Sequence, residues 1–436
     1  MRILAVTHQY RPAIGGAEQY ITTLCEELVT RGHQVIVLTS RSRDYLTWKA
    51  ELARTEELAG VHVQRFTGLV RGKRTWKMLA HGYRGYLRTR SRLYEPLIYL
   101  GNGPVCPGLF WSVLRQAPRC DLVHISNLHY AHSATAYVAA KARRLPVVLT
   151  PHIHVEQPAT YDVGYMRAML RGSDHVLTDT AAEREFLIEA GLDHQRITVG
   201  GAGIRLEQFP LRDKQTCRQE LGLTADATVL LFLGRKTEYK GLDIALEAFV
   251  ALQAQAPKLV LLAVGPETDY SRALWDRYAG LPGVINHGVV SDETRVSMLN
   301  ACDCLVLPST GEAFGIVFLE AWAVGKPVIA VRTRSVSSVI GDGWDGYLIS
   351  PGSASQLAER LLRWVQNPAL AEEMGRRGRA KVLNRYSVPR ITDVIEGAYL
   401  RVLRRSSRHR KGSGLPSAQA QGAPQASSAH QSRGRE

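Results

Sequence analysis

The sequence predicts an α/β protein made of two doubly wound, parallel-sheet domains that face each other across a cleft. Three observations predict this fold class: short apolar runs typical of buried parallel strands recur along the chain, helical patterns alternate with them, and 436 residues suffice for two domains of ordinary size. Apolar residues make up 45% of the chain, so each half can bury a core. The carboxyl ends of both sheets would meet at the cleft, where open parallel sheets bind ligands.

The first half of the chain alternates strands with helices. A strand at residues 3–7 is followed by a glycine-containing loop and by a helix whose apolar stripe stops at Gly32. Helices are also expected at residues 132–144 and up to Ala190. The further strands are expected at residues 35–40, 61–66, 121–126, 146–151, 175–180 and 197–199.

The second half repeats the alternation after a polar stretch at residues 210–228. Its first strand, residues 229–233, leads to Arg235, and an amphipathic helix follows Lys240. Helical segments are expected from residue 353 to about residue 405. The remaining strands are expected at residues 259–265, 284–289, 304–307, 328–331 and 347–349.

The most informative stretch is residues 307–327. A strand and a loop lead to a helix predicted to start at residue 314 or 315 and to stop at Gly325. Glu312 then lies at the helix N-terminus, where free N–H groups and the dipole favour an anion, and Glu320 lies about two turns further on. Two carboxylates beside a phosphate site suit a nucleotide-sugar, because they accept hydrogen bonds from hydroxyls. Two solvated glutamates on an ordinary strand-loop-helix are the alternative.

Three further positions fit a phosphate or sugar site. Gly15 and Gly16 separate the first strand from its helix, which is a phosphate-binding geometry, although a plain tight turn has the same pattern. Arg235 and Lys240 follow one strand end, and two cations there suit a diphosphate better than solvation alone. His152, with His154 close behind, follows the strand at residues 146–151 at the ligand-binding edge of the sheet.

Together these residues resemble the E-x7-E motif and the loops of the family 4 retaining glycosyltransferases, which have the GT-B fold. The motif itself matches at Pro308–Ser309, Glu312, Phe314–Gly315, Glu320–Ala321 and residues 325–328. Residues 15–18 resemble the family's Gly-Gly-x-Glu loop, Arg235 with Lys240–Gly241 its Gly-Arg…Lys-Gly motif, and residues 150–152 its Thr-x-His segment. Residues 332–338 depart from the family's common Gly-Gly-x-x-Glu pattern.

The resemblance covers nearly all of residues 1–400 and implies a GT-B-like organisation. Residues 1–209 would form an N-terminal, acceptor-side Rossmann-like domain, and residues 210–387 a C-terminal, nucleotide-sugar-binding one. A helix at residues 388–405 would cross back to the N-terminal domain. The basic tail, residues 406–436, becomes rich in Ser, Gln, Ala and Gly without an apolar period and is predicted to be disordered.

The resemblance also implies the reaction, a transfer of sugar from a nucleoside-diphosphate sugar to an acceptor hydroxyl with retention, by same-face attack. The catalytic residues would be Glu312, His152, Arg235 and Lys240. The donor would be bound by Gly15, Gly16, Arg235, Lys240, Glu312, Phe314, Gly315, Ile316, Val317 and Glu320, with Glu312 on the sugar and Glu320 on the ribose. The sequence contains no Asp-x-Asp, so we expect neither a metal nor a cofactor beside the donor.

Composition limits the partners. The chain has 55 Lys and Arg against 40 Asp and Glu, a formal charge of +15, which predicts an acidic partner such as anionic lipid, a phosphorylated substrate or nucleic acid. No recognised nucleic-acid module is present, so we expect no nucleic acid partner. A basic nucleic-acid-binding protein and a sugar-nucleotide epimerase of the same architecture are the alternatives. The six cysteines form no Cys-x2-Cys pair and fit a reduced cytosol.

A basic stretch in the first half predicts contact with an anionic membrane, because aromatic side chains lie between its cations. We expect a cytoplasmic protein without a signal peptide or a membrane span, peripheral on the inner face of the cytoplasmic membrane, with a glycan or lipid-linked acceptor. Tyr83, Tyr86 and Tyr94 would add apolar burial; a solvated helical face is the alternative. The residues expected at the membrane or the acceptor are Arg71, Lys73, Arg74, Trp76, Lys77, Arg84, Arg88, Arg90 and Arg92.

Overall fold

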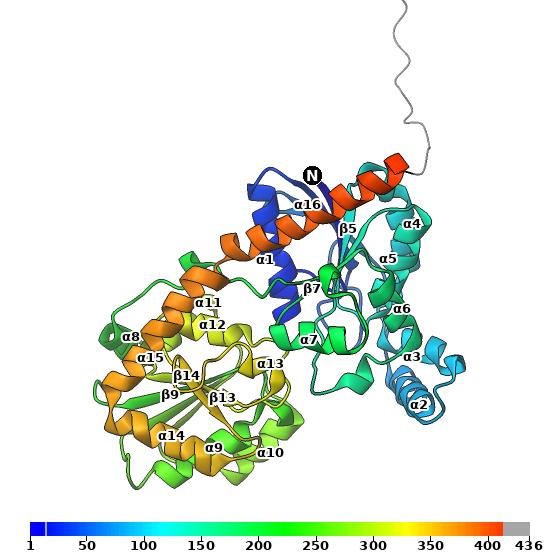
Figure 1. Ribbon diagram of the computed structural model, residues 1–436. Coiled ribbons are helices and arrows are strands. Elements are labelled where there is room, and N and C mark those ends of the chain that lie inside the picture. The colour runs from blue at the N-terminus through cyan, green and yellow to red at the C-terminus, as the bar shows by residue number, and fades with distance from the viewer. Residues whose placement is uncertain (14, 413–436) are drawn as a thin grey trace, which may run out of the picture.

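The computed structural model describes residues 1–13 and 15–412 and shows two sheet-containing domains (Figure 1). The first domain holds an eight-stranded sheet in the order β3-β4-β2-β1-β5-β6-β7-β8. All neighbouring strands are parallel except β3 with β4. Its strands are β1 (Arg2–Val6), β2 (Gln34–Ser40), β3 (Thr55–Leu58), β4 (Val61–Phe66), β5 (Leu122–Ser126), β6 (Val147–Thr150), β7 (His175–Thr178) and β8 (Ile197–Val199).

The second domain holds a six-stranded sheet in the order β11-β10-β9-β12-β13-β14, parallel throughout. These strands are buried apolar runs, as the sequence predicts for strands covered on both faces, with only β11 partly exposed. They are β9 (Thr228–Leu233), β10 (Leu259–Val264), β11 (Val284–His287), β12 (Cys304–Leu307), β13 (Val328–Val331) and β14 (Gly346–Ile349).

Helices connect the strands and cover both sheets (Figure 1). Those of the first domain are α1 (Gly16–Thr30), α2 (Lys73–Thr89), α3 (Glu95–Asn102), α4 (Pro107–Gln116), α5 (Ala131–Ala142), α6 (Gly164–Gly172) and α7 (Ala181–Glu189). Those that follow are α8 (Lys214–Glu220), α9 (Leu242–Leu252), α10 (Asp269–Arg277), α11 (Asp292–Ala301), α12 (Ile316–Ala323), α13 (Arg334–Ser337), α14 (Ala354–Gln366), α15 (Pro368–Lys381) and α16 (Val388–Gly412).

Strand order places the site. In the first sheet the order of connection reverses between β1 and β5, and in the second between β9 and β12. At such a switch point the neighbouring loops leave in opposite directions and open a crevice at the carboxyl ends of the strands. The loop after β1 carries Gly15, and the loops after β9 and β12 carry Arg235 and Glu312. Gly15, Arg235 and Glu312 therefore lie at the two switch points, and His152 follows the neighbouring strand β6.

The predicted fold class, two doubly wound parallel-sheet domains, is confirmed, and one edge of the first sheet adds to it. Strand β3 pairs antiparallel with β4 at that edge. The sequence gives no signal for β3, because Thr-Glu-Glu-Leu has a single apolar residue and is largely exposed. The basic stretch between β4 and β5 folds into three helices, α2 to α4, for which no bounds were predicted.

The last helix, α16, begins beside the second domain and runs across to the first, where it packs on α1 (Figure 1). The hydroxyl oxygen of buried Tyr399 is 2.6 Å from Nδ1 of His124 in β5. Arg31, just after α1, forms ion pairs with Asp393 and Glu396 of α16 at 2.8 and 3.0 Å. The predicted disorder is wrong for residues 406–412, because α16 continues through them. The rest of that prediction, residues 413–436, lies outside the described residues.

Candidate active site

Between the carboxyl edges of the two sheets lies a cavity of about 290 Å³ that residues of both domains line. The sequence-predicted residues that line it are Gly15, Gly16, His152, Arg235, Lys240, Glu312, Phe314, Gly315 and Ile316. They come from four separate segments, those after β1, β6, β9 and β12, so the fold brings together what the sequence holds far apart. Val317 and Glu320 belong to the same predicted donor set and are not in the lining.

Two helix N-termini, those of α1 and α12, open toward the cavity. Neither has a side chain that caps its free N–H groups. Gly315, which precedes α12, has a φ of 87°, and a Cβ there would lie 2.3 Å from the Phe318 ring, so the turn requires glycine. Gly16 lies close to Ile316 across the domain boundary. Uncapped N–H groups and the positive dipole ends form a ready site for an anion such as a diphosphate.

The two predicted cations reach the cavity from the loops after β9. Lys240 forms an ion pair with Glu312. Burial alone would lower the pKa of the Lys240 amine, but the Glu312 carboxylate outweighs burial, so the pKa is raised and the amine stays charged. Arg235 donates to the hydroxyl of Tyr45, a residue of the first domain, and lies 5.0 Å from the centre of its ring. The second domain therefore presents two cations and the Glu312 carboxylate to the cavity.

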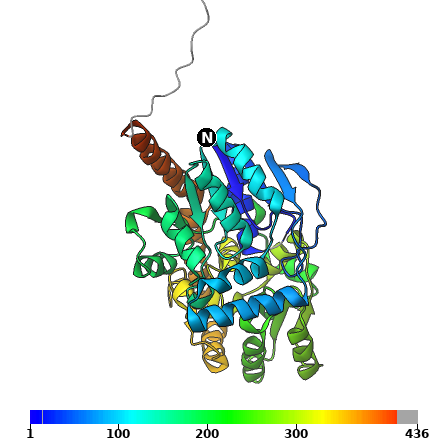
Figure 2. The same ribbon diagram turned by 90° about the vertical axis from the view of Figure 1, so that its right-hand side faces the viewer.

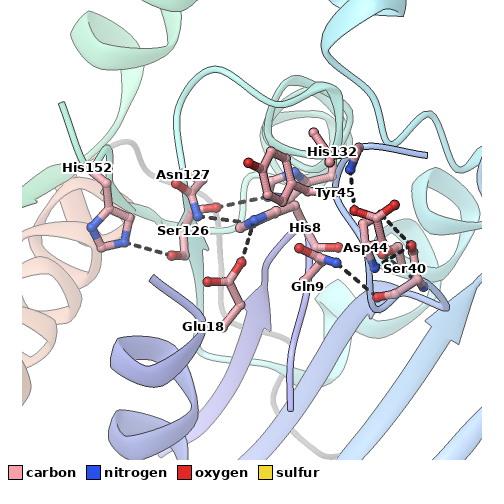
Figure 3. A network of polar contacts seen from close by, with 12 residues as sticks. His8, Gln9, Glu18, Ser40, Asp44, Tyr45, Ser126, Asn127, His132 and His152 are labelled. Atoms are coloured by element: carbon pink, nitrogen blue, oxygen red, sulfur yellow. Dashed lines mark hydrogen bonds and ion pairs between the residues drawn. The ribbon is translucent and has the colours of Figure 1, made fainter. Parts of the chain in front are cut away.

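His152 is held in one orientation by partners on both ring nitrogens. Its Nδ1 is 2.6 Å from Oδ2 of Asp179. Its Nε2 is 3.0 Å from Oγ of Ser126 (Figure 3). Its φ of 52° is unusual for a residue with a side chain, and the next N–H donates to Glu183 at 2.8 Å. Burial alone would lower the pKa of the imidazole, but Asp179 outweighs burial and raises the pKa. The ring is thus a fixed, readily charged group in the wall.

A second histidine, His8, forms a buried pair with Glu18 in the loop-to-helix segment after β1. Its Nε2 is 2.8 Å from Oε1 of Glu18, and Nδ2 of Asn127 is 3.0 Å from its Nδ1 (Figure 3). The ring stacks on Tyr130 with centroids 4.2 Å apart. Burial would raise the pKa of Glu18, but His8 outweighs burial and lowers the pKa. This network fixes the Gly15–Gly16 loop against the sheet edge.

The sequence and the fold match those of known proteins. A family model described as "Glycosyl transferases group 1" matches residues 213–381, and one described as "Glycosyltransferase Family 4" matches residues 14–208. A D-inositol 3-phosphate glycosyltransferase of Stackebrandtia nassauensis is 31% identical over 371 residues, which cover 80% of this chain and 79% of that protein. The chain belongs to the family 4 glycosyltransferases. It is therefore a glycosyltransferase of the GT-B fold, as its motifs indicate.

Further relatives and solved structures agree with this family. The D-inositol 3-phosphate glycosyltransferase of Actinosynnema mirum is 27% identical over 383 residues, which cover 83% of this chain and 86% of that protein. The fold resembles that of sucrose-phosphate synthase from Thermosynechococcus elongatus, with a TM-score of 0.71, 19% identity and coverage of 93% and 100% of the two chains. It also resembles Anabaena HepE in complex with UDP and glucose, with a TM-score of 0.67, 20% identity and coverage of 95% and 99%.

In this family 4 glycosyltransferase, Glu320 lies on α12 away from the cavity lining. Its Oε1 is 2.7 Å from Nη1 of Arg295, which is on α11, and only 4% of the residue is exposed. Burial raises the pKa of Glu320, and Arg295 opposes that rise. The ribose contact of Glu320 and the donor contact of Val317 stay predictions, and the first requires Glu320 to share its carboxylate with Arg295.

Sequence reasoning missed several residues of the cavity wall. Tyr45 lies in the long loop between β2 and β3, and no motif marks it. Asp179 follows β7 and Asn127 follows β5, so both lie at the carboxyl edge where ligands bind. Polar residues directly after apolar strands are thus a signal that finds Asp179 and Asn127, although it does not find Tyr45.

The structure divides the basic stretch of the glycosyltransferase into two groups. Arg71 is buried: it donates to the backbone carbonyls of Tyr45 and Gly101 at 3.2 and 2.7 Å, so its assignment to a membrane or acceptor surface is wrong. Arg90 is already paired with Asp162 at 2.6 Å, and Tyr86, expected at the membrane, is in the core. The exposed group is Lys73, Arg74, Trp76, Lys77, Arg84, Arg88 and Arg92.

The exposed group lies on α2 and just after it. Among the described residues its cations have no hydrogen-bonding or ionic partner. No single described helix is long and apolar enough to cross a membrane. One bent pair of helical segments, residues 92–102 with 107–119, is long and apolar enough by length and composition alone.

No group of three or more His, Cys, Asp or Glu within residues 1–13 and 15–412 is placed to hold a metal, and metal independence stays a prediction.

Proposed function

We propose that this glycosyltransferase binds a nucleoside-diphosphate sugar in the cavity between its domains and transfers the sugar, with retention, to an acceptor hydroxyl. One observation carries the proposal: two uncapped helix N-termini and two cations converge on a cavity that also presents a carboxylate, Glu312. Positive groups suit the diphosphate, and the carboxylate suits sugar hydroxyls. HepE, which has this fold, is known with UDP-glucose bound, which supports the choice of donor.

The diphosphate end of the reaction needs fixed positive charge, because the leaving group gains negative charge in the transition state. Arg235, Lys240 and the N–H groups at Gly16 and at the start of α12 would supply that charge. These groups would act in place of a metal. Arg235 would exchange its hydrogen bond with the Tyr45 hydroxyl for a phosphate oxygen when the donor binds.

The sugar end would lie between His152 and Glu312, which approach from opposite domains. Glu312 would accept hydrogen bonds from sugar hydroxyls, and His152 would lie beside the carbon that develops oxocarbenium character. Every carboxylate in the lining has a partner: Glu18 pairs with His8, Asp179 with His152 and Glu312 with Lys240. The proposal assigns none of them as the nucleophile of a covalent intermediate and takes same-face attack by the acceptor as the route to retention.

The acceptor, in this proposal, is lipid-linked or lies at the inner surface of the cytoplasmic membrane, as in glycolipid or cell-surface polysaccharide synthesis. The exposed cations of α2 and Trp76 support membrane contact, because each cation near an anionic leaflet contributes roughly 1 kcal/mol. The curated relatives are named for an inositol phosphate. That name favours the alternative, an anionic acceptor away from any membrane that the same cations bind.

The donor is tested by a panel of nucleotide sugars. A true donor stabilises the fold by mass action, by about 2.7 kcal/mol at a concentration of 100 times its Kd. The stabilising sugar is then incubated with membrane lipid and with an inositol phosphate, and NMR of the product reports whether the anomeric configuration is retained. Release of an epimerised nucleotide sugar without transfer would support an epimerase instead. Inversion of the anomeric centre would contradict the proposed same-face attack.

A further inference from the structure

A second hollow, larger than the donor cavity, lies elsewhere on the first domain. It has a volume of about 700 Å³ and runs between α4 and the sheet edge formed by β3 and β4. Helix α4 lies on the side of the first domain that faces the viewer in Figure 2. Ser112 of α4 donates to Gln64 of β4 at 3.1 Å and joins the two sides of the hollow. We call this hollow the β4–α4 groove.

The β4–α4 groove is strongly cationic. Four arginines line it, and no Asp or Glu is among its lining residues. Arg54, Arg115 and Arg119 are exposed and have no hydrogen-bonding or ionic partner among the described residues. Buried Arg65 pairs with Glu56 at 2.6 Å, while its Nε has no partner in the described part of the chain. The Arg65 side chain is fully buried, so the three exposed arginines carry the free positive charge of the groove.

An exposed aromatic side chain stands in the same lining. Trp111 of α4 has 69% of its surface exposed, and its ring touches protein edge-on at Phe110, with centroids 5.4 Å apart. Thr55, Thr67 and Gln116 add hydroxyl and amide groups to the wall. The groove thus combines one aromatic face, several positive charges and neutral hydrogen-bonding groups.

We propose that the β4–α4 groove binds an anionic oligosaccharide, a chain of sugars that carries carboxylate, sulfate or phosphate groups. The Trp111 ring would cover the apolar face of one sugar ring, the three exposed arginines would pair with its acid groups, and the hydroxyl and amide groups would bind its hydroxyls. Such a ligand matches all three features of the lining. This binding needs neither a donor nor turnover. The groove can therefore fail to bind the oligosaccharide while the proposed transfer holds, and it can bind the oligosaccharide while the proposed transfer fails.

Two other anionic partners fit the groove less well. A single-stranded nucleic acid binds through successive bases stacked on several aromatic rings, and this groove exposes one. An anionic bilayer is a flat surface, which the exposed face of α2 matches better than a hollow does. Both remain outcomes of the test below.

The test measures affinity by calorimetry at physiological salt, with tetragalacturonic acid as the anionic probe and maltotetraose as its neutral counterpart. A groove variant carries Arg54→Ser, Arg115→Ser and Arg119→Ser. We expect it to bind tetragalacturonic acid at least about threefold more weakly, since exposed pairs contribute about 0.2–1 kcal/mol each and the variant removes three of them. Trp111→Ala should weaken binding by a smaller factor, and maltotetraose should bind the wild type more weakly than the anionic probe does.

The matched control, the α2 variant, carries Lys77→Ser, Arg84→Ser and Arg88→Ser. It removes the same charge from the same domain outside the groove, and we expect it to bind tetragalacturonic acid like the wild type. The proposal is overturned in favour of unspecific charge if both variants lose the same affinity for tetragalacturonic acid. It is also overturned if the groove variant still binds this probe as tightly as the wild type does. If the wild type binds an oligothymidylate more tightly than tetragalacturonic acid, the proposal is overturned in favour of a nucleic acid. If it binds phosphatidylglycerol vesicles more tightly and only the groove variant loses that binding, the proposal is overturned in favour of a membrane. Thermal melting confirms that every variant is folded.

Discussion

At the scale of single residues, Arg235 and Glu312 face the same cavity from the two loops at one switch point of the second sheet. We expect Arg235→Ala and Glu312→Ala each to lower kcat by about 10²–10³, the usual cost of losing one group that stabilises charge in the transition state. Steady-state transfer rates with the donor found by thermal shift check this.

The control for Glu312 must keep the fold, because Glu312→Ala leaves the Lys240 amine without its partner. Glu312→Gln keeps the shape and a hydrogen-bond acceptor. Both variants should melt cooperatively. Near-normal turnover by Arg235→Ala or by both Glu312 variants would remove that residue from the site.

The pair of His152 and Asp179 predicts a dependence of stability on pH. Since Asp179 raises the pKa of His152 in the folded state, the pair's stabilisation is complete below the unfolded pKa and is lost as pH rises through the folded one. Asp179→Asn should cost about 3–5 kcal/mol at low pH, as for a broken buried pair, and clearly less at high pH. Urea unfolding at about pH 6 and about pH 9, either side of the histidine range, measures it. An equal loss at both values would contradict the assigned charge.

The two cations of the cavity, Arg235 and Lys240, predict that transfer needs no metal ion. If Arg235, Lys240 and the two helix N-termini hold the diphosphate, transfer by the purified enzyme should continue in EDTA. Loss of activity in EDTA that magnesium or manganese restores would show that the positive charge comes from an ion instead.

At the scale of an element, α2 is the part that decides between a membrane and another acceptor. The corrected cation set predicts that the wild type floats with anionic liposomes at physiological salt and that the α2 variant does so much less, since each cation contributes roughly 1 kcal/mol. The groove variant serves as the control with equal charge and should float like the wild type. If the wild type stays with the unbound protein, α2 is an acceptor site or a solvated face.

Elements with a strong apolar period were predictable from sequence, and side-chain pairing was not. Local sequence signals mark the buried runs of β1 and β9 and the glycine turn before α12. The position of the cavity could be predicted because it lies where these segments end. Arg71 carries a charge in a basic run and gives no sign of burial, because its carbonyl partners come from residues 45 and 101–102. Tyr45 meets Arg235 only when the two domains pack together.

At the scale of the whole molecule, α16 ties the two domains through a buried contact. The Tyr399 hydroxyl is 2.6 Å from Nδ1 of His124, and Nε2 of His124 is 2.7 Å from Oγ1 of Thr150. Burial lowers the pKa of His124 to about 3, so the ring is neutral. Tyr399→Phe leaves the ring nitrogen unpaired and should cost about 1–3 kcal/mol of unfolding free energy.

Denaturant unfolding measures this cost. Arg401→Ala is the control on the same helix, because its exposed hydrogen bond to Thr198 should change stability by no more than about 0.5 kcal/mol. Equal and small effects of both substitutions would show that α16 contributes to the first domain by apolar packing alone.

The chain passes from one domain to the other twice, and the two crossings are hydrogen-bonded to each other. The Ile204 N–H donates to the Tyr386 carbonyl at 2.8 Å, and the Val388 N–H donates to the Ile204 carbonyl at 3.1 Å. Segments about 180 residues apart in sequence are therefore joined at the domain boundary. We expect any rotation of one domain against the other to turn about this bridge, and such a rotation would break the contact of Tyr45 with Arg235.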